Sequence, residues 1–283
     1  MTKRVRLGML TPSSNTVVET MTAAMLSGVP EVSAHFSRFR VTEITASAGS
    51  DRQFGEEEIL RAAELLAHAK VDVIAWNGTS ASWLGFDRDE QLCARIVAST
   101  GVAACTSVLA FREIFERTGV SRVGLVTPYV DAVQAKIVEN WRAAGVSCPG
   151  ERHCGLQDNF AFAEVSERDI AAMARAVAGS GAEAIAIVCT NMRAAQLVES
   201  LEAELGLPVY DSIATTLWKC LILANVPPAR IRGWGRLFSN PLLDTPEPGW
   251  LQHPKPQLDK PRPRFGAKPR VDRLRERTSP AGE

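Results

Sequence analysis

The chain has 283 residues, 46% of them hydrophobic, which is enough to form one large or two modest α/β domains with buried cores. Its 32 basic and 32 acidic residues balance, so no overall charge attracts it to nucleic acid or to a membrane surface. The N-terminus lacks the apolar segment of a secretion signal and no apolar run approaches membrane-spanning length, so we expect a cytoplasmic protein with no membrane partner. The six cysteines form no CxxC pair and no zinc-like group with the four histidines, so we expect neither disulfides nor a bound metal.

Apolar strand-like segments alternate with longer helical patterns, which predicts repeated βαβ units and mainly parallel sheets. The expected strands are 4–10, 32–39, 71–76, 102–105, 122–126, 184–188 and 207–210. The expected helices are 17–26, 56–69, 87–99, 108–118, 131–144, 167–178, 194–204 and 213–224. From residue 241 proline, lysine and arginine are frequent and the apolar periodicity ends, so we expect 241–283 to be a disordered tail.

Three segments of the first half recur in the same order in the second half. RLGMLTP at 6–12 resembles RVGLVTP at 122–128, VIAWNGTS at 73–80 resembles AIAIVCTN at 184–191, and VAACTS at 102–107 resembles PVYDS at 208–212. The recurrence indicates duplication, with an N-terminal α/β lobe at 1–118, a C-terminal α/β lobe at 119–225, and a segment at 226–240 that returns to the first lobe. The alternative is that any two βα units look alike. Ligands bind at the carboxyl ends of parallel strands, so the repeated turns are expected to meet across a cleft.

The turn after the strand at 184–188 is the strongest candidate for catalysis. Cys189 stands between the end of that strand and a helix expected to start near Ala194, and the positive end of a helix would lower the pKa of the thiol. A thiol placed in this way suits a proton donor or a nucleophile. Thr190 and Asn191 offer donors that hold a carboxylate or an enolate oxygen in place. The alternative is an inert core cysteine at the end of a strand.

The corresponding turn of the first half has glycine where the second half has the thiol. Gly78 takes the place of Cys189, while Thr79 and Ser80 keep their hydroxyl groups. A turn with donors but without an acid or base is expected to bind oxygen atoms rather than to move protons. The alternative is an ordinary turn in which a hydroxyl caps the next helix.

Two further turns are expected to reach the same cleft. Ser14 and Asn15 follow the first strand, where they can cap the next helix and point N–H groups at an anion. Tyr129 follows the matching strand of the second half and can donate its phenol hydroxyl to a carboxylate or an enediolate. The alternative for Tyr129 is a buried structural tyrosine.

Together these motifs resemble the aspartate/glutamate racemase superfamily, in the branch of maleate cis–trans isomerases and arylmalonate decarboxylases. The resemblance covers about 4–240 and rests on PSSNT at 12–16, GTSAS at 78–82, TPY at 127–129, CTN at 189–191 and GWGRLF at 233–238. It implies two pseudo-symmetric Rossmann-like lobes with parallel sheets, an active site in the cleft between them, and no cofactor or metal. The racemases and isomerases of this superfamily carry one cysteine from each lobe, and Gly78 departs from that pattern.

With one thiol, the resemblance implies an arylmalonate-decarboxylase-like lyase acting on a small carboxylic acid. Loss of CO₂ produces an enediolate that needs one proton, whereas racemisation needs an acid or base on each face. Cys189 would then protonate the intermediate, while Gly78, Thr79, Ser80 and Tyr129 would hold its oxygens.

Other functions stay open. The loop at 13–15 looks more like the maleate isomerase version, so a maleate isomerase or an Asp/Glu-type racemase is the alternative, and a non-catalytic carboxylate-binding protein is a further one. The Gly78→Cys substitution is expected to introduce racemase activity if the two turns oppose each other. We expect no nucleic-acid partner, and a homo-oligomer stays open.

Overall fold

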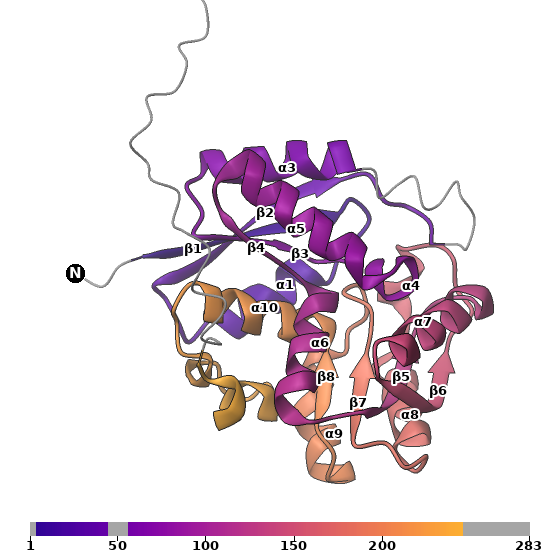
Figure 1. The fold of residues 1–283 in the computed structure, drawn as a ribbon. Helices are drawn as coiled ribbons and strands as arrows, with labels where there is room; N and C mark the ends of the chain where they lie inside the picture. Colours follow the sequence, from indigo (N-terminus) through magenta and orange to yellow (C-terminus); the bar gives the residue numbers. More distant parts are fainter. Residues whose placement is uncertain (1–3, 45–55, 246–283) are drawn as a thin grey trace, which may run out of the picture. The chain divides into compact units, whose positions relative to one another are not determined.

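Two four-stranded parallel sheets form the framework of the computed structural model, which describes residues 4–44 and 56–245 (Figure 1). The first sheet has the strand order β2-β1-β3-β4 and the second has the order β6-β5-β7-β8. The strands of the first sheet are β1 (Val5–Pro12), β2 (Val32–Phe39), β3 (Val73–Trp76) and β4 (Ala103–Thr106). Those of the second are β5 (Arg122–Thr127), β6 (Ser147–His153), β7 (Ala184–Ile187) and β8 (Val209–Asp211).

The identical strand order of the two sheets agrees with the repeat in the sequence. The central strands β3 and β7 are buried at every position, as strands covered on both faces of a parallel sheet must be. The predicted α/β fold with two similar parallel sheets is therefore confirmed.

Strand β6 was not expected from the sequence. Its sequence, SCPGERH, contains proline, glycine and four charged or polar side chains, and it has no apolar alternation. It lies at the edge of the second sheet, where it pairs with β5. An edge strand tolerates a proline because one side of its backbone needs no sheet partner.

Helices follow most of the strands, and none within residues 4–44 and 56–245 is long and apolar enough to cross a membrane. Their bounds are α1 (Val18–Leu26), α3 (Glu56–His68), α4 (Ala81–Leu84), α5 (Phe86–Thr100), α6 (Ser107–Thr118), α7 (Asp131–Ala143), α8 (Glu167–Ala178), α9 (Val198–Leu205) and α10 (Ser212–Leu223). The short α4 was not expected. The helix expected at 194–204 starts as a 3₁₀ turn at Ala195–Leu197 and becomes α9 only at Val198.

One helix of each half of the chain packs against the other half. Helix α6 follows β4, yet Phe115 on it packs against the rings of Trp141 (5.6 Å) and Tyr210 (6.0 Å) of the second half. Helix α10 follows β8, yet it contacts β3, β4 and α1 of the first half. The two helices also touch each other, where the Ser107 and Thr216 hydroxyls lie 2.7 Å apart. This exchange fixes the ends of β3 and β7 relative to each other.

The segment after α10 contacts the first half again. Arg230 forms an ion pair with Glu31, just before β2. The predicted tail begins with a 3₁₀ helix, Pro241–Leu243, in which Leu243 is buried and its carbonyl accepts a hydrogen bond from Trp218 Nε1 (2.9 Å). The rest of that segment, from residue 246, lies outside the described residues.

Candidate active site

The turns after β1, β3 and β7 meet at the carboxyl ends of their strands. Thr190 Oγ1, after β7, donates to the carbonyl oxygen of Asn77, after β3 (2.9 Å). Asn15 Nδ2, after β1, donates to both the carbonyl and the hydroxyl oxygen of Thr190 (3.1 Å each). Sequence positions as far apart as 15 and 190 are thus joined at the place where parallel α/β sheets bind ligands.

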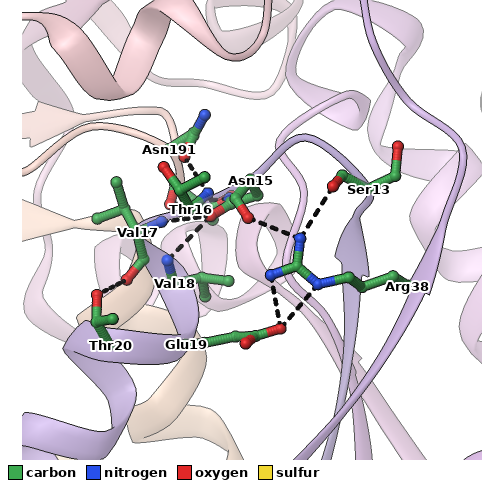
Figure 2. Close-up of polar contacts among 10 residues, drawn as sticks. Ser13, Asn15, Thr16, Val17, Val18, Glu19, Thr20, Arg38 and Asn191 are labelled. Carbon is green, nitrogen blue, oxygen red and sulfur yellow. Dashed lines mark hydrogen bonds and ion pairs between the residues drawn. The ribbon is translucent and has the colours of Figure 1, made fainter.

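Asn15 and Asn191 hold the two halves together with their side-chain amides (Figure 2). Asn15 Oδ1 accepts from the first N–H groups of α1, at Val17 (2.9 Å) and Val18 (3.0 Å), while its Nδ2 reaches Thr190. Asn191 Oδ1 accepts from the backbone N–H of Thr16 (2.9 Å). Both asparagines are buried and their amides are used within the chain, so in this arrangement they position the loops.

The loop after β1 is anchored on its outer side as well. Arg38 donates to the carbonyl oxygens of Ser13 and Asn15 (2.9 Å each) and forms an ion pair with Glu19 (2.8 Å), as Figure 2 shows. Ser14 Oγ donates to the carbonyl of Val41 (2.6 Å). The positive charge of Arg38 is therefore balanced by a carboxylate and by backbone oxygens.

Asn159 is a connecting residue that the sequence did not reveal. Its Nδ2 donates to Ser14 Oγ (2.7 Å) and its carbonyl accepts from Asn191 Nδ2 (2.5 Å). Its backbone N–H donates to the carbonyl of Thr42 (2.9 Å). Asn159 thus joins Ser14 of the first half to Asn191 of the second half.

Thr79, Tyr129 and Cys189 form a hydrogen-bonded chain across the two halves. The Tyr129 hydroxyl lies 2.6 Å from Thr79 Oγ1, and it also hydrogen-bonds to the thiol of Cys189. Cys189 Sγ accepts from the backbone N–H of Asn191 (3.3 Å). Thr79, Tyr129 and Cys189 are 5%, 2% and 3% exposed, so the three polar groups share one buried cluster. The structure brings together the thiol and the facing donors that the sequence suggested.

Aromatic rings enclose this cluster. The ring of Trp83 packs edge-on against Tyr129 with centroids 5.2 Å apart, and the ring of Phe162 does so at 5.4 Å. Both rings are buried. The surroundings of the thiol and the phenol are therefore mainly apolar.

Burial raises the pKa of the Cys189 thiol to about 12, although the N–H of Asn191 and the phenol of Tyr129 act in the opposite direction. This corrects the expectation of a lowered pKa. That expectation needed a helix starting near Ala194, whereas α9 starts at Val198, so the positive helix end is not placed at the thiol. At neutral pH the group is a protonated thiol, which can donate a proton.

Gly78 occupies the place that Cys189 has in the other half, since each lies two residues after its strand ends, at Trp76 and Ile187. A Cβ atom on Gly78 would overlap Cζ2 and Cε2 of the Trp76 indole and would lie 2.5 Å from its Cη2. Trp76 is 1% exposed. No observation tests the expectation that Gly78→Cys introduces racemase activity, but the indole leaves no room for the new side chain unless it moves.

The turn after Gly78 holds donors that the chain itself does not use. Among the described residues, none accepts a hydrogen bond from the backbone N–H groups of Thr79 and Ser80 or from the Ser80 hydroxyl. Helix α4 starts directly after them, at Ala81. These are the groups best placed to hold an oxygen atom of a ligand.

Asp211, at the end of β8, is a second titratable group beside the thiol. It is fully buried, and burial raises its pKa to about 7. Its charge is one of the causes that raise the pKa of Cys189. Sequence reasoning did not single out Asp211, because Asp is common at the start of a helix.

Features elsewhere in the chain also bear on where a ligand could bind. In the part of the chain that the structure describes, no group of three His, Cys, Asp or Glu side chains is arranged to hold a metal ion. A cavity of about 350 Å³ lies at the C-terminal end of α1, lined by Met25, Ser27, Gly28, Arg230, Arg232 and Trp234. The turns described above lie instead at the N-terminal end of α1.

Known proteins are similar to this chain in sequence and in fold. Residues 7–238 match the family model for arylmalonate decarboxylase. A maleate isomerase of Nocardia farcinica is 30% identical over 243 residues, which cover 82% of this chain and 95% of that protein. The arylmalonate decarboxylase of Bordetella bronchiseptica is 25% identical over 235 residues, covering 82% and 95%.

A solved structure of the N. farcinica maleate cis–trans isomerase is similar to this chain, with a TM-score of 0.77 and 26% identity. The similarity covers 86% of this chain and 99% of that one, and the structure is of a cysteine-to-serine mutant with a covalently bound succinylcysteine intermediate. These relatives are enzymes, and the resemblance drawn from the motifs is confirmed. Because the matching model spans most of its length, the chain belongs to the arylmalonate decarboxylase family.

Proposed function

We propose that the chain decarboxylates a substituted malonate and that Cys189 delivers a proton to the resulting enediolate. The asymmetry of the two turns carries this proposal: a thiol follows β7, whereas a glycine covered by an indole follows β3. Decarboxylation needs one proton delivered from one face, whereas racemisation needs an acid or base on both faces. A single thiol is sufficient for the first reaction.

In the proposed reaction, the bond from Cα to one carboxylate breaks and CO₂ leaves, while the electron pair of that bond stays on Cα and is delocalised into the remaining carboxylate. The N–H groups of Thr79 and Ser80, with the hydroxyls of Ser80 and Tyr129, would stabilise the negative oxygens. Cys189 then gives its proton to Cα, and the thiolate takes a proton from solvent.

Two features of the site suit this chemistry. With a pKa of about 12 the Cys189 thiol is protonated before the reaction, as a proton donor must be. The rings of Trp76, Trp83 and Phe162 are buried, and they would provide an apolar wall for an aryl or alkyl substituent. No cofactor enters these steps.

A maleate isomerase reaction is the second candidate. It is favoured by the identity of 30% to the N. farcinica maleate isomerase, the solved structure of which carries a succinylcysteine intermediate. In that reaction the Cys189 sulfur would add to the double bond of maleate, which requires a thiolate. The decarboxylase reaction is favoured instead by the raised pKa of Cys189, which keeps the thiol protonated, and by the glycine at position 78.

The test is to incubate the purified protein with phenylmalonate, an alkyl-substituted malonate and maleate. We expect CO₂ release from at least one malonate, and loss of that release in Cys189→Ala. The matched control is Cys220→Ala, which removes another buried thiol outside these turns and should keep the activity. Conversion of maleate to fumarate without CO₂ release would refute the decarboxylase proposal in favour of the isomerase.

A further inference from the structure

The ends of β3 and β7 are built in the same way. Ser107 Oγ donates to the carbonyl of Trp76 (3.3 Å) at the end of β3, and Ser212 Oγ donates to the carbonyl of Ile187 (2.9 Å) at the end of β7. Trp76 and Ile187 are therefore equivalent positions, and so are the residues two places further on, Gly78 and Cys189. One half combines a very large side chain with glycine, and the other combines a medium-sized side chain with a thiol.

The indole of Trp76 lies over the position of the missing side chain. The atoms that a Cβ on Gly78 would meet, Cζ2, Cε2 and Cη2, all belong to its six-membered ring. The indole cannot easily move aside, because it is 1% exposed and packs against the ring of Phe39 with centroids 5.0 Å apart. The backbone of Gly78 itself does not require glycine, since its φ lies outside the left-handed region.

We propose that Trp76 is a specificity-determining residue: its indole fills the position of a second thiol and so restricts the site to proton transfer from the side of Cys189. The claim about proton transfer rests on the proposed function, whereas the claim that the indole excludes a side chain at position 78 does not. It implies that a prochiral malonate gives one enantiomer. It also implies that the protein does not racemise the product acid, because racemisation needs an acid or base on both faces and position 78 supplies no thiol.

The structural part is tested by a double-mutant cycle that needs no substrate. Gly78→Ala adds only the Cβ atom, and in the wild-type background we expect overpacking against the indole to lower Tm by roughly 5 °C. In the Trp76→Ile background, which copies Ile187, the same substitution should leave Tm unchanged or raise it. Gly179→Ala is the matched control, because its Cβ meets nothing within 4 Å and should act equally in both backgrounds.

Trp76→Phe gives a second version of the cycle if the smaller isoleucine leaves a cavity too large for folding. A Tm change for Gly78→Ala that is the same with and without Trp76 would overturn the proposal.

The chemical part is tested by the racemisation of one enantiomer of 2-phenylpropionate, followed by chiral chromatography. We expect racemisation in Trp76→Ile/Gly78→Cys at a rate roughly 10²-fold above that of either single variant. Adding Cys189→Ala should abolish racemisation, because only one face then carries a thiol. Racemisation in Gly78→Cys alone as fast as in the double variant would refute the role of Trp76, and so would a folded double variant without racemisation. If the wild type releases no CO₂ from any malonate, the proposed function fails, while the stability cycle still decides whether the indole excludes a side chain at position 78.

Discussion

Replacing Asp211 by asparagine tests how burial acts on the titratable groups near the thiol. Asp211 Oδ1 accepts from the N–H groups of Ile213 (2.8 Å) and Ala214 (3.0 Å) and so caps α10. Its Oδ2 has no hydrogen-bond partner among the described residues. Burial raises the pKa of the carboxyl from 3.8 to about 7. Asparagine keeps the oxygen that caps the helix but removes the titrating proton.

Because its pKa is raised on folding, Asp211 binds its proton more tightly in the folded protein than in the unfolded chain. Its contribution to the free energy of unfolding is therefore largest below the pKa of the unfolded chain and is lost as the pH rises toward about 7. Between about pH 5 and about pH 7 this loss amounts to about 2 kcal/mol of the free energy of unfolding. Asp89, which is also buried and has a pKa raised to about 7, adds a loss of the same sign.

Urea unfolding of the wild type, Asp211→Asn and Asp89→Asn at several pH values between about 5 and 7 measures this difference. Each variant should lose less stability than the wild type over that range, by about 2 kcal/mol. In Asp211→Asn the pKa of Cys189 should also fall, because the Asp211 charge is one of the causes that raise it. The ultraviolet absorbance of the thiolate follows that pKa. An unchanged slope of stability against pH in Asp211→Asn would mean that the carboxyl is ionised in the folded protein, and the reasoning from burial would be wrong.

Three further predictions concern other buried groups. Alkylation of Cys189 by iodoacetamide, followed by mass spectrometry, should keep accelerating beyond about pH 10, because the pKa of the thiol is raised from 9.0 to about 12; a plateau near pH 9 would contradict this. Tyr129→Phe removes the hydroxyl that bonds to Cys189, so we expect the rate of CO₂ release to fall by about 10²-fold, and an unchanged rate would exclude the phenol from the reaction. Lys219→Met removes one of the two cations beside Glu113, the other being Arg117, and should lower the free energy of unfolding by about 3 kcal/mol in urea titrations. Most of that loss should return in Lys219→Met/Glu113→Gln, and no recovery would show that packing rather than charge is responsible.

Much of the fold could be predicted because the buried strands have recognisably apolar sequences. The runs VIAW and AIAI are apolar throughout, and such runs mark strands that are covered on both faces. The strand at 147–153 has no such pattern, because an edge strand is held by backbone pairing to β5 and buries little side-chain surface. The short helix Ala81–Leu84 is likewise too brief to produce a periodic pattern. The division into lobes at residue 118 stays a prediction, and the exchange of α6 and α10 could not be foreseen, since it depends on contacts between residues far apart in the chain.

At the site, the sequence located the turns but not the environment of their side chains. The pairing of Cys189 with a glycine in the other half was visible in the repeat. The pKa of the thiol was not, because desolvation depends on everything packed around it. Asn15 and Asn191 look like free donors in the sequence, yet each bonds across the two halves. The role proposed for Trp76 could not be predicted either, because an aromatic residue at the end of a strand usually belongs to the core.

The two halves share a backbone plan, and this allows them to differ in chemistry. The helix after β4 is capped by Thr106, and the helix after β8 is capped by Asp211, at equivalent positions. A neutral cap thus belongs to the half with Gly78, and a titratable cap belongs to the half with Cys189. Because either side chain satisfies the same N–H groups, exchanging one for the other leaves the frame intact. In the proposed reaction the thiol and the titratable cap would therefore come from one half, while the other half would supply hydrogen-bond donors and the wall formed by Trp76, an arrangement that suits a reaction with a single proton transfer.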